Sequence, residues 1–215
     1  IDYYFHFHHE DFFHDQYPSN FKYKTIIFGL EPRLYQKIKP FEKRISNKIL
    51  NSGNVGNLKI PSRIINTIKN PKWNALSCYK LRTMCNKLPY VDYTSTLQHE
   101  FVGDKYPLLL EKYCSAIAAC TFNPLIKYWE IPAAGCLTFM EITKKNKGEF
   151  LGYEDEKTVI AIDENNYVEK FEKYLADPQS SKWKKIADAG RDYTLKKFTN
   201  KKAVESLVDL MKNFV

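Results

Sequence analysis

Short apolar runs alternate with longer amphipathic segments through the second half of the chain, and this alternation restricts the fold more than any other feature. The apolar runs cover residues 115–120 (SAIAAC), 136–141 (CLTFME) and 159–162 (VIAI). Apolar residues recur at helical spacing between and after them, over residues 105–113, 125–134, 163–176, 181–198 and 200–214. Strands separated by helices of this length form right-handed crossovers and a parallel sheet. We therefore predict an α/β fold, a Rossmann-like parallel sheet flanked by helices.

The first half of the chain has a weaker version of the same pattern. Two further strands are predicted there, the first of them buried: residues 23–29 (YKTIIFG) and 44–50 (RISNKIL). The second strand runs into a polar glycine loop at residues 51–56, and two helices follow, one from Pro61 and one over residues 73–87. Ligands of a parallel sheet bind beyond the carboxyl ends of its strands. We therefore expect a ligand at the loop of residues 51–56 or at the turn of residues 120–130.

The charge of the chain is unevenly distributed. The 215 residues carry a formal net charge of +8, from 33 Lys and Arg against 25 Asp and Glu. Residues 32–87 contain 13 basic side chains and one acidic side chain, Glu42, whereas residues 92–177 are acidic. A basic block of this size predicts an anionic partner, either phosphate groups or nucleic acid. None of the usual nucleic-acid-binding motifs accompanies the block. The alternative function is therefore a non-catalytic α/β module that binds nucleotides or nucleic acid through residues 32–87.

Composition excludes several classes of protein. Aliphatic and aromatic residues suffice for a core, which excludes disorder of the whole chain. No apolar run approaches the roughly 18 residues of a membrane-spanning helix. The five cysteines form no CxxC pair, so we expect buried free thiols in a reducing, cytoplasmic setting. Because the sequence begins at Ile1, we expect that an upstream segment is missing.

Residues 127–136 (KYWEIPAAGC) follow an apolar run and lead into a predicted helix. Lys127 and Glu130 are one turn apart near its amino-terminal end, where free backbone amides favour phosphate groups. The carboxylate of Glu130 offers paired acceptor oxygens, which match the two hydroxyl groups of a ribose. The structural alternative is a partly exposed glutamate that favours the helix dipole and pairs with Lys127 on the surface.

The run KYWEIPAAGCLTFME, residues 127–141, resembles the donor-binding signature of GT-B glycosyltransferases, in which an E-x-x-A-x-G helix leads to a strand. Residues 152–178 and 183–211 are similar to the C-terminal end of the same family. The chain most resembles the spore-maturation, or spore-coat, branch of the group 1 glycosyltransferases. The resemblance covers roughly residues 40–215 and implies a GT-B C-terminal, donor-binding domain.

The resemblance also implies a reaction and a set of site residues. A hexose or related sugar would pass from a nucleotide-sugar to an unknown glycan, protein or small-molecule acceptor, without a metal ion or another cofactor. Glu130 would take the ribose-binding position of the family, and Lys127 the basic position that faces the diphosphate. Ser52 and Gly53 would form the glycine turn that brings backbone amides to the phosphates, and Arg63 would supply a second phosphate contact.

One position departs from the family pattern. Many members that retain the anomeric configuration carry a second glutamate eight positions before the ribose glutamate, where this chain has Phe122. A carboxylate that would contact the sugar is therefore absent from this position. The resemblance accordingly leaves the sugar and the stereochemical outcome open.

The same resemblance divides the chain into two parts. Residues 41–215 form the predicted nucleotide-sugar donor-binding domain, and residues 1–40 are a remnant or a reduced version of the acceptor side. In such enzymes the acceptor binds to a second, N-terminal Rossmann-like domain. We therefore expect that domain to be missing from this chain.

Four histidines lie near the start of the chain: His6, His8, His9 and His14. Together with Glu10, Asp11 and Asp15 they resemble a metal cluster, although their spacing matches no standard ligand set. Two other interpretations are open. The segment is an exposed aromatic strand or an inter-domain edge that is rich in histidine by composition, or one of its histidines is the general base of the transfer.

Overall fold

The computed structural model describes residues 3–14, 20, 22–56, 60–69, 74–94 and 100–212. Within these residues, the main sheet contains five strands: β3 (Ile49–Ser52), β4 (Val91–Thr94), β5 (Ser115–Ala118), β6 (Leu137–Glu141) and β7 (Ile160–Ile162). They lie in the order β4-β3-β5-β6-β7, and each neighbouring pair is parallel. The predicted α/β fold with a parallel sheet is therefore confirmed.

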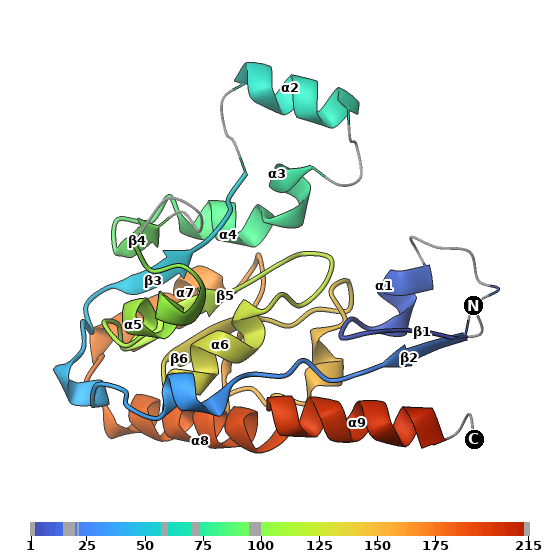
Figure 1. Cartoon of the computed structure of the whole chain (residues 1–215). Coiled ribbons are helices and arrows are strands. Elements are labelled where there is room, and N and C mark those ends of the chain that lie inside the picture. The colour runs from blue at the N-terminus through green and yellow to red at the C-terminus, as the bar shows by residue number, and fades with distance from the viewer. Residues whose placement is uncertain are drawn as a thin grey trace.

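Helices pack on both faces of this sheet (Figure 1). The helices that follow β3 are α2 (Ile60–Lys69), α3 (Ala75–Cys78), α4 (Lys80–Cys85), α5 (Tyr106–Leu110), α6 (Lys127–Ala133), α7 (Tyr167–Ala176), α8 (Ser181–Lys197) and α9 (Asn200–Lys212). Side chains alternate along β5, so Ala116 and Ala118 pack with Trp129 of α6 while Ile117 packs with Phe171 of α7. All five helices predicted in the second half are present, α7 beginning later than expected.

The N-terminal strand is the clearest departure from prediction. Strand β2 (Lys22–Thr25) pairs with β1 (Tyr3–His6) in a separate two-stranded sheet, and α1 (Glu10–His14) lies between them in sequence. The predicted buried strand over residues 23–29 is therefore wrong in its burial, and residues 26–29 are not in a strand. The reason is that Lys22 and Lys24 alternate with half-buried residues, so only one face of β2 is covered.

The first strand of the main sheet and the helices after it also differ in their bounds. β3 begins at Ile49 and includes Asn51 and Ser52, so the loop that follows starts at Gly53. The helix predicted over residues 73–87 is two short helices, α3 and α4, which meet at Tyr79. Trp73 lies outside the described residues. Strand β4, which pairs with β3 at the edge of the sheet, was not predicted.

Despite its separate sheet, the N-terminal segment packs on the same body as the rest of the chain. The ring centre of Phe7 lies 5.6 Å from that of Trp129. The ring of Phe28 stacks on Trp129 with a distance of 5.1 Å between the ring centres. Further along, the carbonyl of Tyr35 accepts a hydrogen bond from Arg191 of α8 at 2.8 Å. These contacts hold Phe7, Phe28 and Tyr35 against the helices that cover the sheet, and the division at residue 40 stays a prediction.

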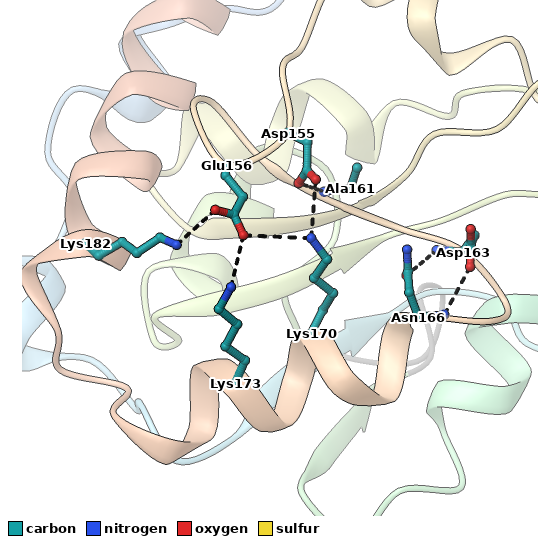
Figure 2. Close-up of polar contacts among 8 residues, drawn as sticks. All are labelled: Asp155, Glu156, Ala161, Asp163, Asn166, Lys170, Lys173 and Lys182. Carbon is teal, nitrogen blue, oxygen red and sulfur yellow. Dashed lines mark hydrogen bonds and ion pairs between the residues drawn. The ribbon is translucent and has the colours of Figure 1, made fainter.

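A network of charged side chains holds the edge strand β7 to the helices beside it (Figure 2). Glu156 contacts Lys173 of α7 at 3.2 Å and Lys182 of α8 at 3.0 Å. Asp155 accepts a hydrogen bond from the backbone amide of Ala161 at 2.7 Å and contacts Lys170 at 3.3 Å. Two lysine-rich helices are thereby attached to the loop before β7.

The described residues contain five free thiols and no helix that is long and apolar enough to cross a membrane. Four of the cysteines are buried, as predicted, and Cys78 is half-buried. The cytoplasmic setting inferred from them stays a prediction.

Candidate functional site

The order of the strands reverses between β3 and β5. The chain passes from β3 outward to β4, then returns to β5 on the other side of β3 and continues through β6 to β7. Where the strand order reverses in this way, ligands bind beyond the carboxyl ends of the two central strands. Here those ends are Ser52 and Ala118, and helix α6 follows β5 through residues 119–126.

A cavity of about 670 Å³ lies at the start of α6. Three segments that are remote in the sequence line it, namely residues 6–12, 101–106 and 123–130. Most of the lining is apolar, and the polar side chains in it are His6, His8, Tyr106, Asn123, Lys127 and Glu130. Lys127 and Glu130, the two residues at the centre of the sequence-based hypothesis, thus line one cavity.

Tyr106 of α5 positions the ammonium group of Lys127. The Nζ atom of Lys127 donates a hydrogen bond to the Tyr106 hydroxyl at 2.9 Å and lies 4.0 Å from the centre of the ring. Burial, opposed by the Glu130 carboxylate and aided by the Arg82 guanidinium, lowers the pKa of Lys127 to about 8. The lysine is therefore a cation at neutral pH that loses its proton easily.

Glu130 presents its carboxylate to the same cavity. Burial raises its pKa above the usual value for glutamate, and the charge of Lys127 opposes that shift. Among the described residues, no side chain or amide donates a hydrogen bond to this carboxylate. A half-buried carboxylate with unused acceptor oxygens is suited to bind the hydroxyl groups of a ligand.

Two of the four N-terminal histidines, His6 and His8, line the same cavity. The Nε2 atom of His8 lies 3.0 Å from the Asn123 amide nitrogen, and burial and the neighbouring His6 lower the pKa of His8 to about 4. His8 is therefore neutral at pH 7. No three His, Cys, Asp or Glu side chains of the described residues gather closely enough to hold a metal ion, and Asp15 lies outside those residues. The general-base hypothesis stays open.

Ser52 and Gly53 lie at the end of β3 but do not line the cavity. The carbonyl of Ser52 accepts a hydrogen bond from the buried Arg82, and the amide of Gly53 donates one to the carbonyl of Thr94 at 2.9 Å. Gly53 has a φ of 114°, a conformation that favours glycine. The side chain of Ser52 lies beside Tyr106, which connects this turn with Lys127. The turn therefore contacts Tyr106, which lines the cavity, without lining the cavity itself.

Arg63 belongs to α2, which stands apart from the sheet in Figure 1, and its side chain lies outside the described residues. Two other arginines of the basic block are buried parts of the fold. Arg82 bonds to Asn51 and Ser52 of β3, and Arg44 donates hydrogen bonds to the carbonyls at the end of α6. The number of basic residues in 32–87 is therefore larger than the number of positive charges that a ligand can reach.

Sequence reasoning missed the residues that complete the cavity. Tyr106 and Asn123, which hold Lys127 and His8, were not identified, and neither was the apolar wall that includes Phe101. Pro107 signals a helix start next to Tyr106, but nothing local places that tyrosine under Lys127. The contacts arise from the packing of α5 against α6.

Comparison with known proteins adds information at the level of structure. No protein-family model and no curated protein matches the sequence. Sucrose-phosphate synthase from Thermosynechococcus elongatus matches with a TM-score of 0.59 and 12% identity, over 95% of this chain and 56% of the synthase. HepE from Anabaena, solved in complex with UDP and glucose, matches with a TM-score of 0.56 and 13% identity, over 88% of this chain and 56% of HepE.

The C-terminal domain of the group 1 family glycosyl transferase LpcC from Francisella tularensis matches with a TM-score of 0.50 and 14% identity. That match covers 80% of this chain and 100% of the domain. The chain therefore spans little more than half of sucrose-phosphate synthase and HepE, but the whole length of an isolated C-terminal domain. At identities this low the likeness shows the fold alone, a parallel sheet flanked by helices that matches GT-B glycosyltransferase domains.

Proposed function

We propose that this chain is the donor-binding part of a glycosyltransferase that transfers a sugar from a nucleotide-sugar to an acceptor. The observation that carries the proposal is the Lys127 and Glu130 pair in the cavity at the strand-order reversal of a GT-B-type sheet. HepE, whose solved complexes contain UDP, makes uridine nucleotides the first donors to test. The finer assignments, to a hexose and to the spore-maturation branch, rest on the sequence resemblance alone.

The roles follow from the chemistry of each side chain. The Glu130 oxygens would accept hydrogen bonds from the two ribose hydroxyls, because a carboxylate offers two acceptors to a vicinal diol. Lys127 would place its positive charge on the diphosphate, with Tyr106 fixing its position. The Ser52-Gly53 turn, which lies outside the cavity lining, would act on the phosphates only through Tyr106 beside it, and Arg63 would add a contact from α2.

Departure of the nucleoside diphosphate leaves negative charge on its phosphate oxygens. A cation placed there before the reaction stabilises that charge without reorganisation. In this proposal Lys127 supplies the cation, so transfer needs no metal ion. The acceptor would bind on the side of the N-terminal segment, where His6 and His8 face the cavity.

A thermal-shift panel of UDP, GDP, ADP, CMP and dTDP without metal tests the proposal. A nucleotide at 100 times its Kd stabilises a protein by about 2.7 kcal/mol, which raises Tm measurably. We expect one nucleotide to raise the Tm of the wild type and of Glu169→Gln, a change at an exposed glutamate of α7, but not of Glu130→Gln. Equal shifts in all three proteins, or none in the wild type, would contradict the proposed site.

A further inference from the structure

Helix α2 leaves three isoleucines on the surface. Ile64, Ile65 and Ile68 have exposed fractions of 56%, 51% and 75%. Positions three and four apart in a helix are neighbours, so Ile68 adjoins both other residues and the three form one patch. Isoleucine is among the residues most often buried in proteins. In Figure 1 the helix stands apart from the sheet and from the helices that cover it.

The chain around this patch is uniformly basic. Residues 43–91, which contain α2, include ten Lys and Arg and no Asp or Glu. Arg44 and Arg82 are buried and bonded within the fold, and Lys48 and Lys80 pair with acidic side chains. Three other lysines of the segment are exposed: Lys43, Lys69 and Lys87. One of them, Lys69, lies in the last turn of α2 itself. The proposed donor site, which draws on Lys127 and on Arg63, does not explain this block.

The combination of charge and apolar surface selects the partner. Nucleic acid would account for the basic residues but gives no reason to expose three isoleucines. An apolar protein partner would account for the isoleucines but gives no reason for 49 residues without an acid. The surface of an anionic bilayer attracts lysine and arginine to its headgroups and takes apolar side chains into the acyl boundary beneath them.

We propose that α2 docks this protein on anionic membranes, with Ile64, Ile65 and Ile68 inserted at the headgroup boundary. The helix has ten residues, far fewer than a helix that crosses a bilayer, so it would lie in the plane of the surface and bind reversibly. Docking uses the three isoleucines of α2 and none of the residues that line the cavity. Arg63, the proposed phosphate contact, lies in the same helix, and flotation without nucleotide tests docking separately from the proposed function.

Vesicle flotation tests the proposal. The full chain is mixed with vesicles of phosphatidylcholine, or of phosphatidylcholine with phosphatidylglycerol, and the bound fraction is measured at low and high salt. The test variant is Ile64→Asp/Ile68→Asp. The matched control is Val204→Asp/Val208→Asp in α9, which changes two residues at the same spacing with exposed fractions of 59% and 43%. Both variants alter exposed positions, and an unchanged Tm verifies that each is folded.

We expect the wild type and the α9 variant to float with anionic vesicles and to be released by salt, and the α2 variant to bind at least tenfold more weakly. Three results would overturn the proposal: no flotation of the wild type, equal loss in both variants, or equal binding to vesicles of phosphatidylcholine alone. Binding of single-stranded RNA that survives the α2 change, without flotation, would favour nucleic acid instead. A dimer in solution that only the α2 variant disrupts would favour a second copy of the chain.

Discussion

Glu141, the last residue of β6, is the buried carboxyl group that the proposed site does not use. It is 3% exposed, and its Oε2 atom has no hydrogen-bond partner among the described residues. Burial, together with the charges of Glu164 and Asp163 and against the opposing charge of Lys145, raises its pKa to about 7. A protonated Glu141 is therefore favoured in the folded protein at mildly acidic pH.

This shift predicts how stability depends on pH. The unfolded chain releases the proton near the ordinary glutamate pKa and the folded chain near 7, so the contribution of Glu141 is greatest below the unfolded pKa and is lost as pH rises through 7. We compare the free energy of unfolding of Glu141→Gln with that of the wild type. We expect this difference to shift in favour of the variant between pH 5 and pH 8, by up to about 3 kcal/mol. Urea unfolding of both proteins at the two pH values measures it. A constant difference would show that the pKa of Glu141 is not raised.

Lys127 gives a prediction for binding. Because its pKa is about 8, the free protein loses this charge above that pH and an anionic nucleotide must bring the proton back. We expect the Kd of the nucleotide found in the panel to rise about tenfold between pH 8 and pH 9.5. Lys127→Arg, which keeps its charge throughout, should bind with a nearly constant Kd over this range. Titration calorimetry at each pH is the measurement, and a constant Kd for the wild type would show that Lys127 does not face the nucleotide.

At the scale of elements, α6 is held at its carboxyl end by a side chain from a distant loop. The Arg44 guanidinium donates hydrogen bonds to the carbonyls of Ala134 at 3.0 Å, Gly135 at 3.2 Å and Lys39 at 2.8 Å. Gly135 has a φ of 68°, the left-handed conformation that commonly ends a helix. Since α6 carries both Lys127 and Glu130, Arg44 fixes the helix that presents the site.

Removal of this contact should destabilise the fold. We expect Arg44→Met to lower the free energy of unfolding by about 2–4 kcal/mol, because several buried carbonyls lose their partner. Lys43→Met, at the exposed neighbouring position, should change it by less than about 0.5 kcal/mol. Urea unfolding of the two variants measures the effect. Similar midpoints for both would mean that the end of α6 does not depend on Arg44.

The elements that could be predicted from the sequence are those with an unambiguous burial pattern. Strands β5 and β6 are buried on both faces and read as continuous apolar runs, so they and the helices around them were predicted. Strand β4 lies at the edge of the sheet, and its sequence VDYT has only half-buried or exposed residues, which local patterns do not distinguish from a loop. Strand β2 was predicted to be buried because the residues of β2 do not reveal that its partner is β1 and not a strand of the main sheet.

At the scale of the whole molecule, the cavity is assembled from parts that meet only in the folded chain. His8 and Asn123, whose side chains meet in its wall, are separated by 115 positions in sequence. Lys127 and Glu130 could be predicted because they share one turn of one helix. The wall formed by residues 6–12 could not, because its place depends on Phe7 and Phe28 packing against Trp129. The N-terminal segment thus contributes directly to the candidate site.

The central claim is that Glu130 binds the ribose of a nucleotide donor. Its most direct test is the Kd of the nucleoside diphosphate found in the panel and of its 2′-deoxy form, for the wild type and for Glu130→Gln. The account predicts that the wild type binds the ribose form about tenfold or more tightly, as expected for hydrogen bonds to a charged group, and that Glu130→Gln largely loses this preference. Equal affinity of the wild type for both forms, or a preference that survives in Glu130→Gln, would contradict it.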